Sequence, residues 1–82
     1  MPTVLRFLGF RVAIYLNDHR PAHVHVIGAD REAVFELQCP DGPPKLRESF
    51  GFHHHQLSFV KARLADSVAK LSEDWERIHG DY

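Results

Sequence analysis

Three of the seven histidines fall within seven residues of one another, in the stretch Asp18-His19-Arg20-Pro21-Ala22-His23-Val24-His25-Val26. His23 and His25 stand at i and i+2, so an extended strand places both side chains on one face, about 7 Å apart. A proline bends the chain between this pair and His19. If the loop folds back, His19 and Asp18 join the pair. So dense a group of titratable side chains predicts a site.

A metal centre is one chemistry that these residues support. Imidazole nitrogen is a common ligand for zinc and other transition ions, and three protein ligands with one open position are typical of catalytic zinc. The metal hypothesis takes His19, His23 and His25 as ligands. Asp18 is then a fourth ligand or the group that orients an imidazole. It predicts zinc or another transition metal as cofactor.

Acid–base chemistry without a metal is a second hypothesis, and it needs no cofactor. Imidazole titrates near neutral pH, so one histidine can remove the proton of an RNA 2′-hydroxyl while another protonates the leaving oxygen. A small ribonuclease also needs cations to contact the phosphate. The residues predicted for these roles are His23 and His25 as acid and base, His19 and Asp18 as positioning groups, and Arg20 and Arg11 as phosphate contacts.

A third hypothesis assigns these residues no chemistry. His23 and His25 are then polar residues on the solvated face of a half-buried sheet, while Asp18 and His19 close a turn through hydrogen bonds to the backbone. In this case the chain is a non-catalytic interaction module, which binds a neighbouring protein through a sheet edge or a helix.

Size and composition limit the class of protein. The chain has 82 residues, which is enough for one domain, residues 1–82. Its core is small, so a partner, a metal or a homodimer would help to stabilise the fold. The formal net charge of −1 argues against a dedicated nucleic-acid binder, which normally carries a basic excess.

The distribution of charge and cysteine indicates the compartment. Arg6 and Arg11 interrupt the N-terminal apolar runs, so no secretory signal is expected, and no stretch reaches the about 20 apolar residues of a membrane span. The single cysteine, Cys39, excludes an intramolecular disulfide and fits a reducing compartment. We expect a cytoplasmic protein with no membrane partner.

Alternating apolar and polar residues predict an antiparallel meander of about four strands. The second of them should place Val12, Ile14 and Leu16 on its buried face. The predicted strands span about 3–8, 10–16, 23–27 and 32–37. Proline and glycine then predict a loop over 39–45. The segment that follows, up to residue 52, is either a short edge strand or an irregular approach to a helix.

An apolar stripe at helical spacing runs through the C-terminal third. It predicts one long helix over about 54–79, packed on one face of the sheet, or two collinear helices that meet near Asp66; Gly80 is a natural stop. The stripe consists of Leu57, Val60, Leu64, Val68, Leu71, Trp75 and Ile78. The tract His53-His54-His55 stands where this helix begins, and it could bind metal adventitiously.

The chain also resembles a known family. The residues that carry the resemblance are Met1-Pro2-Thr3-Val4-Leu5-Arg6, Gly9-Phe10-Arg11, Asn17-Asp18-His19, Pro21, His23-Val24-His25-Val26, Gly51-Phe52 and Trp75. They are similar to the small prokaryotic "domain of unknown function 4160" family. This chain departs from the usual pattern at Ala22, where a second proline is common, and at His53–His55, where polar capping and basic residues are commoner.

The resemblance implies a partner. Members of this family are often encoded beside another small protein, and such pairs have been suggested to be toxin–antitoxin-like. We therefore expect an α+β domain that acts as the toxin-like component of a two-protein module, as a metal-independent ribonuclease with RNA as substrate. The alternatives are a histidine-ligated metal protein and an interaction module.

Overall fold

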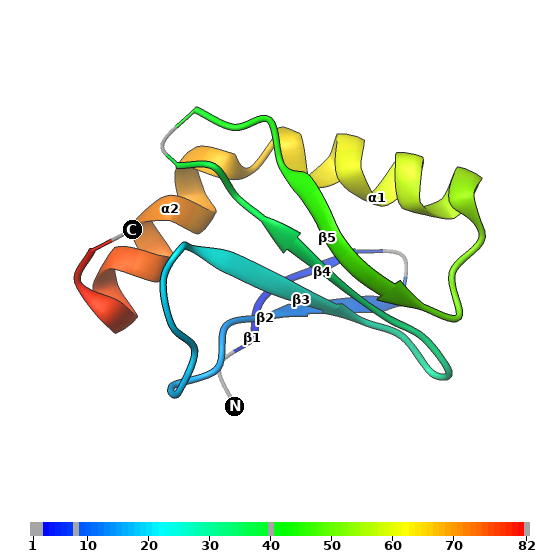
Figure 1. The fold of residues 1–82 in the computed structure, drawn as a ribbon, viewed down its shortest axis with the longest axis horizontal. Helices are drawn as coiled ribbons and strands as arrows, with labels where there is room; N and C mark the ends of the chain where they lie inside the picture. The colour runs from blue at the N-terminus through cyan, green and yellow to red at the C-terminus, as the bar shows by residue number, and fades with distance from the viewer. Residues whose placement is uncertain (1–2, 8, 40, 82) are drawn as a thin grey trace.

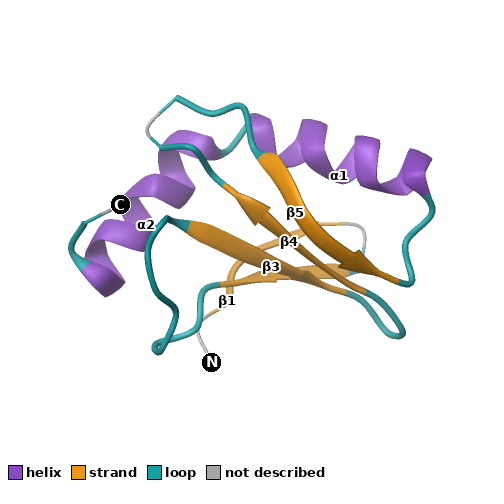
Figure 2. Cartoon of the chain, in the orientation of Figure 1, coloured by secondary structure: helices purple, strands orange, loops and turns teal. Residues whose placement is uncertain are grey.

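The computed structural model describes residues 3–7, 9–39 and 41–81. One antiparallel sheet holds five strands in chain order, namely β1 (Thr3–Phe7), β2 (Phe10–Ala13), β3 (His23–Ile27), β4 (Glu32–Glu36) and β5 (Lys45–Phe50). Two helices, α1 (His54–Ala65) and α2 (Val68–His79), follow the sheet and lie on one side of it (Figures 1 and 2). The predicted α+β class is confirmed. Leu8, predicted to end the first strand, lies outside the described residues, as do Met1 and Pro2.

The sheet has five strands instead of the predicted four or so, because Lys45–Phe50 forms the edge strand that is one of the two alternatives predicted for this segment. This strand pairs with β4 and lies at the edge of the sheet. All six of its residues are exposed. The segment therefore lacks the alternation of apolar and polar residues that is typical of a half-buried strand. Its charged residues are typical of an edge, where they discourage pairing with other chains.

The second strand ends three residues earlier than predicted. The side chain of Asp18 accepts a hydrogen bond from the backbone N–H of Tyr15 at 2.9 Å, and the N–H of Asp18 donates to the Tyr15 carbonyl at 3.1 Å. These bonds hold the Tyr15 backbone in a turn instead of a strand. Ile14 is buried as predicted, but Leu16 is 74% exposed, because the chain has already left the sheet.

The C-terminal stripe forms two helices that meet at Asp66, as the second of the two alternatives predicts, but they are not collinear. A straight helix over residues 54–79 would be about 39 Å long, whereas the longest dimension of the molecule is 33 Å. The chain breaks at Asp66 and Ser67, and α2 turns away from the line of α1 (Figure 1). The break keeps the apolar stripe on the core, since Leu64 and Leu71, on either side of it, are both fully buried.

The two faces of the sheet differ in what covers them. Val24 and Val26 of β3 belong to the core that the sheet shares with Val60 and Leu64 of α1. His23 and His25 alternate with these valines, so they face the side of the sheet opposite α1. The end of α2 reaches this side, where Trp75 contacts His23, and His23 is buried instead of lying on a solvated face. None of the helices in the described residues is both long and apolar enough to span a bilayer.

We predict that Leu64→Ala lowers the free energy of unfolding by about 2–5 kcal/mol, because it removes a fully buried side chain and leaves a cavity between α1 and the sheet. Lys61→Ala, at an exposed position of the same helix, should change it by less than about 0.5 kcal/mol. Urea denaturation followed by circular dichroism measures both values. Equal losses in the two variants would contradict the described packing of α1.

Candidate metal centre

Asp18, His23 and His25 bring one ligand atom each to a common point. The Oδ1 atom of Asp18 lies 3.4 Å from Nε2 of His23 and 3.3 Å from Nε2 of His25. One ligand atom from each of the three residues lies within 4.8 Å of the others. The two imidazole rings come from the same face of β3, with their centroids 5.3 Å apart. The strand alternation therefore places this pair as the sequence predicts.

Asp18 reaches the imidazoles because its own turn fixes it. Its Oδ2 atom accepts the N–H of Tyr15, which leaves Oδ1 to face the two rings. The side chain is only 12% exposed. Burial alone would raise the pKa of the Asp18 carboxyl, but the Tyr15 N–H and the two imidazoles outweigh burial and lower it below its ordinary value. Asp18 is therefore a carboxylate at neutral pH.

Both imidazoles are oriented through their Nδ1 atoms. Nδ1 of His23 lies 2.9 Å from the carbonyl oxygen of Pro21, and Nδ1 of His25 lies 3.3 Å from Oε2 of Glu32. Each of these oxygens can only accept a hydrogen bond, so each Nδ1 is placed to donate one. When the ring is neutral with its proton on Nδ1, Nε2 carries a lone pair. In that form two lone pairs and a carboxylate oxygen meet at one point.

Aromatic residues pack beside this centre. The ring of Tyr15 lies 4.4 Å from that of His25, centroid to centroid. Trp75, fully buried in α2, lies 5.4 Å from the His23 ring on one side and 4.3 Å from the His79 ring on the other. Burial and then the charge of Glu32 raise the pKa of the Tyr15 hydroxyl, so it stays protonated at neutral pH.

The end of α2 is also tied to the loop that carries Asp18. Nε2 of His79 lies 3.0 Å from the carbonyl oxygen of Tyr15, so it is placed to donate a hydrogen bond to it. The C-terminal helix thus contacts the centre twice, through Trp75 against His23 and through His79 against Tyr15. Movement of this helix end would disturb the position of the imidazoles.

The centre opens into a cavity of about 280 Å³. Its lining consists of Asn17, Asp18, His19, Arg20, His23, His25, Val34, Arg47 and Glu48. His19 and Arg20, both singled out in the sequence, are exposed and line this cavity. His19 is not in the group of converging ligand atoms, which takes Asp18 in its place.

Arg11 lies on β2 outside this cavity. Arg11 pairs with Ile27 of β3, whereas Ala13, two residues further along β2, pairs with His25. Arg11 therefore lies two residues along the strand from the centre. Its guanidinium lies 3.5 Å from the hydroxyl of Thr3 on β1. Of the two predicted phosphate contacts, the structure places Arg20 beside the imidazoles and Arg11 farther away.

Sequence reasoning missed Glu32, Tyr15, Trp75 and Arg47. Glu32 could have been found, because in the hairpin of β3 and β4 it pairs with Ile27, two residues from His25 on the same face. Trp75 and Arg47 come from distant parts of the chain. The periodicity of their own segments carries no signal for a contact with β3.

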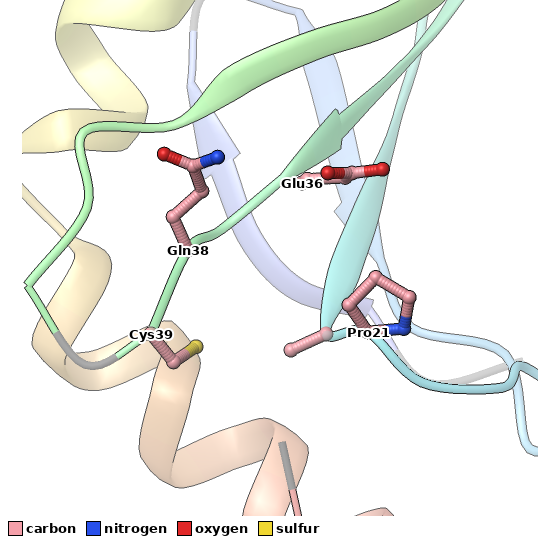
Figure 3. A pocket seen from close by; sticks show the side chains of 5 residues that line it. Pro21, Glu36, Gln38 and Cys39 are labelled. Atoms are coloured by element: carbon pink, nitrogen blue, oxygen red, sulfur yellow. The ribbon is translucent and has the colours of Figure 1, made fainter.

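A second cavity, of about 340 Å³, lies beside Cys39 (Figure 3). Pro21, Glu36 and Gln38 also line it, but the three clustered side chains do not. The Ser72 hydroxyl donates a hydrogen bond to Sγ of Cys39 at 2.9 Å, and burial raises the pKa of the thiol. A protonated, partly buried thiol is a poor nucleophile and a poor metal ligand, so this cavity does not compete with the histidine centre.

Comparisons with known proteins agree with the resemblance noted in the sequence. Residues 9–76 match the model of a family described as a domain of unknown function, DUF4160. No curated protein and no solved structure matches the chain. The match covers most of the chain, including Asp18, both clustered histidines and Trp75. The chain belongs to the DUF4160 family.

Proposed function

We propose that this domain binds a divalent first-row transition ion of the zinc type through Asp18, His23 and His25. The observation that carries the proposal is the convergence of two imidazole Nε2 atoms and one carboxylate oxygen, on side chains that are each oriented by a second hydrogen bond. With the imidazoles neutral and protonated on Nδ1, these three atoms repel one another unless a cation lies between them. Imidazole and carboxylate ligands suit zinc, and they also suit iron(II), cobalt(II) and nickel(II).

The separations between the atoms support an ion over a proton. A charge-assisted N–H···O bond is normally about 2.7–2.9 Å long, but the two Nε2–Oδ1 distances are 3.4 and 3.3 Å. Tetrahedral ligands with bonds of about 2.0–2.1 Å to zinc stand about 3.3–3.4 Å apart. The spacing around Oδ1 therefore supports ligation of a common metal ion.

The groups behind the ligands are those that metal sites use. The Nδ1 atom of a metal-bound histidine typically donates to a carbonyl or a carboxylate, which fixes the tautomer and makes the ring more basic. His23 has the Pro21 carbonyl for this purpose, and His25 has Glu32. Three protein ligands next to a cavity leave a coordination position for water or substrate, as in catalytic zinc sites.

This proposal uses the residues of the predicted ribonuclease in a different way. Acid and base in phosphodiester cleavage must act on two different oxygens of the substrate. Here both Nε2 atoms lie against the same carboxylate oxygen, and His23 is buried. This arrangement favours metal ligation over metal-free acid–base catalysis. The RNA substrate, the toxin-like role and the cognate small partner stay predictions.

We predict that tag-free protein, first stripped by a chelator, binds one zinc ion per chain. Saturation at 100 times the dissociation constant should raise the free energy of unfolding by about 2.7 kcal/mol, and a chelator should reverse the gain. Isothermal titration calorimetry gives the stoichiometry. Trp75 is the only tryptophan and lies next to His23, so paramagnetic cobalt(II) should quench its fluorescence.

Substitutions separate this centre from the exposed histidine tract. His23→Gln and His25→Gln should each weaken zinc binding by at least 100-fold, and His19→Ala should weaken it less than 10-fold, since His19 lies outside the ligand group. The matched control is His54→Gln, in the exposed tract at the start of α1, which should leave binding unchanged. Loss of the ion in the control, with retention in His23→Gln, would refute the assignment.

Asp18 allows ligation to be separated from folding. In Asp18→Asn the side-chain oxygen can still accept the Tyr15 N–H, and the amide group can donate to the two Nε2 lone pairs. We predict that the metal-free variant stays within about 1 kcal/mol of wild type in unfolding free energy but no longer binds zinc. Asp18→Ala should cost about 1–3 kcal/mol, because the Tyr15 N–H loses its partner. Chemical denaturation and zinc titration of both variants test this, and zinc binding by Asp18→Asn at wild-type affinity would contradict it.

A further inference from the structure

Two arginines, Arg20 and Arg47, also line the cavity beside the centre. Arg47 lies on β5, and nothing in the sequence pattern connects it with the histidines of β3. It reaches them because the pairing of β4 with β5 is irregular: Phe35 pairs with Leu46, but the next residue, Val34, pairs with Glu48. Arg47 is the extra residue of this β-bulge, with no position opposite it on β4.

The bulge decides where the Arg47 side chain goes. In a regular strand, neighbouring side chains point to opposite faces, so Arg47 and Glu48 would lie on different sides of the sheet. Here both line the same cavity, together with His23 and His25. Bulges re-aim side chains in this way and are common next to active sites.

Arg20 reaches the same cavity from the loop between β2 and β3. Its contact with Asp81 is 3.9 Å long, and both side chains are largely exposed. A surface pair of this length holds Arg20 only weakly, so the guanidinium is available to a ligand. Arg20 and Arg47 therefore approach the centre from two different elements.

The charges of the cavity assign the kind of ligand. The charges of its two lining arginines are balanced by those of two lining acidic residues, Asp18 and Glu48, and Glu32 lies next to Nδ1 of His25. The cavity has no positive excess of its own. A divalent ion at the centre would supply the charge that draws an anion, and a dianion would neutralise that charge.

We propose, on the basis of the proposed metal function, that the cavity binds a phosphate dianion. One phosphate oxygen takes the open coordination position of the ion, and Arg47 and Arg20 pair with the others. Guanidinium groups bind phosphate through two parallel hydrogen bonds, which suits this geometry. The ligand is inorganic phosphate or the terminal phosphate of a monoester, and binding requires the ion.

The test uses cobalt-loaded, full-length protein with inorganic phosphate as probe, and it follows phosphorus-31 relaxation. Loaded wild type should bind phosphate, and the metal-free protein should not. Arg47→Gln should weaken binding at least 10-fold, with Arg47→Lys in between, because lysine keeps the charge but loses the paired hydrogen bonds. Lys45→Gln is the matched control: it removes an exposed charge of the same strand outside the cavity and should change affinity less than twofold.

Other outcomes overturn the inference. Equal phosphate affinity in Arg47→Gln and Lys45→Gln would refute the role of Arg47, and binding by metal-free protein would refute coordination to the ion. Cobalt stoichiometry is measured on every sample: if wild type takes up no metal, the proposed function fails, whereas one ion per chain without phosphate binding refutes this inference alone.

Two further probes identify the source of the phosphate. Tighter binding of glycerol phosphate than of inorganic phosphate supports a monoester ligand, and the reverse order supports free phosphate. Tighter binding of a dinucleoside monophosphate, a monoanionic diester, would overturn the assignment to a dianion.

Discussion

The centre depends on the hydrogen bond from the Tyr15 N–H to Asp18. This bond ends β2, sets the direction of the loop and turns the second carboxylate oxygen toward the imidazoles. The N–H of Asp18 closes the same turn from the other side by donating to the Tyr15 carbonyl. One short turn thus controls both the length of a strand and the composition of the candidate site. The same carboxylate serves the fold with one oxygen and the proposed chemistry with the other.

The rest of the fold keeps the imidazoles on the face of the sheet opposite α1. Val24 and Val26 are fixed in the core by the helices, and because side chains alternate along a strand, this packing forces His23 and His25 to the opposite side. A slip of one residue in the register of β3 would exchange the valines for the histidines and bury two polar rings in the core. The hydrophobic core therefore stabilises the geometry of the site as well as the fold.

The features that could be predicted from the sequence are those determined by residues that lie close together along the chain. Strand β3 and the shared face of its two histidines follow from alternation within five residues, and the structure has them as predicted. A break near Asp66 is one of the predicted alternatives, but the change of direction between α1 and α2 is not predicted, because periodicity carries no signal for it. The approach of Arg47 depends on a bulge in an exposed edge strand, where hydrophobic patterning gives no signal. Local chemistry was thus predictable, but contacts between distant elements were not.

X-ray absorption spectroscopy at the zinc edge tests the central claim most directly. The sample is tag-free, zinc-loaded protein in which His53, His54 and His55 are changed to glutamine, so that the exposed tract contributes nothing. The account predicts nitrogen and oxygen neighbours at about 2.0–2.1 Å, with the outer-shell scattering of two imidazoles. A sulfur neighbour at about 2.3 Å, or a shell of oxygen atoms without imidazole scattering, would contradict it.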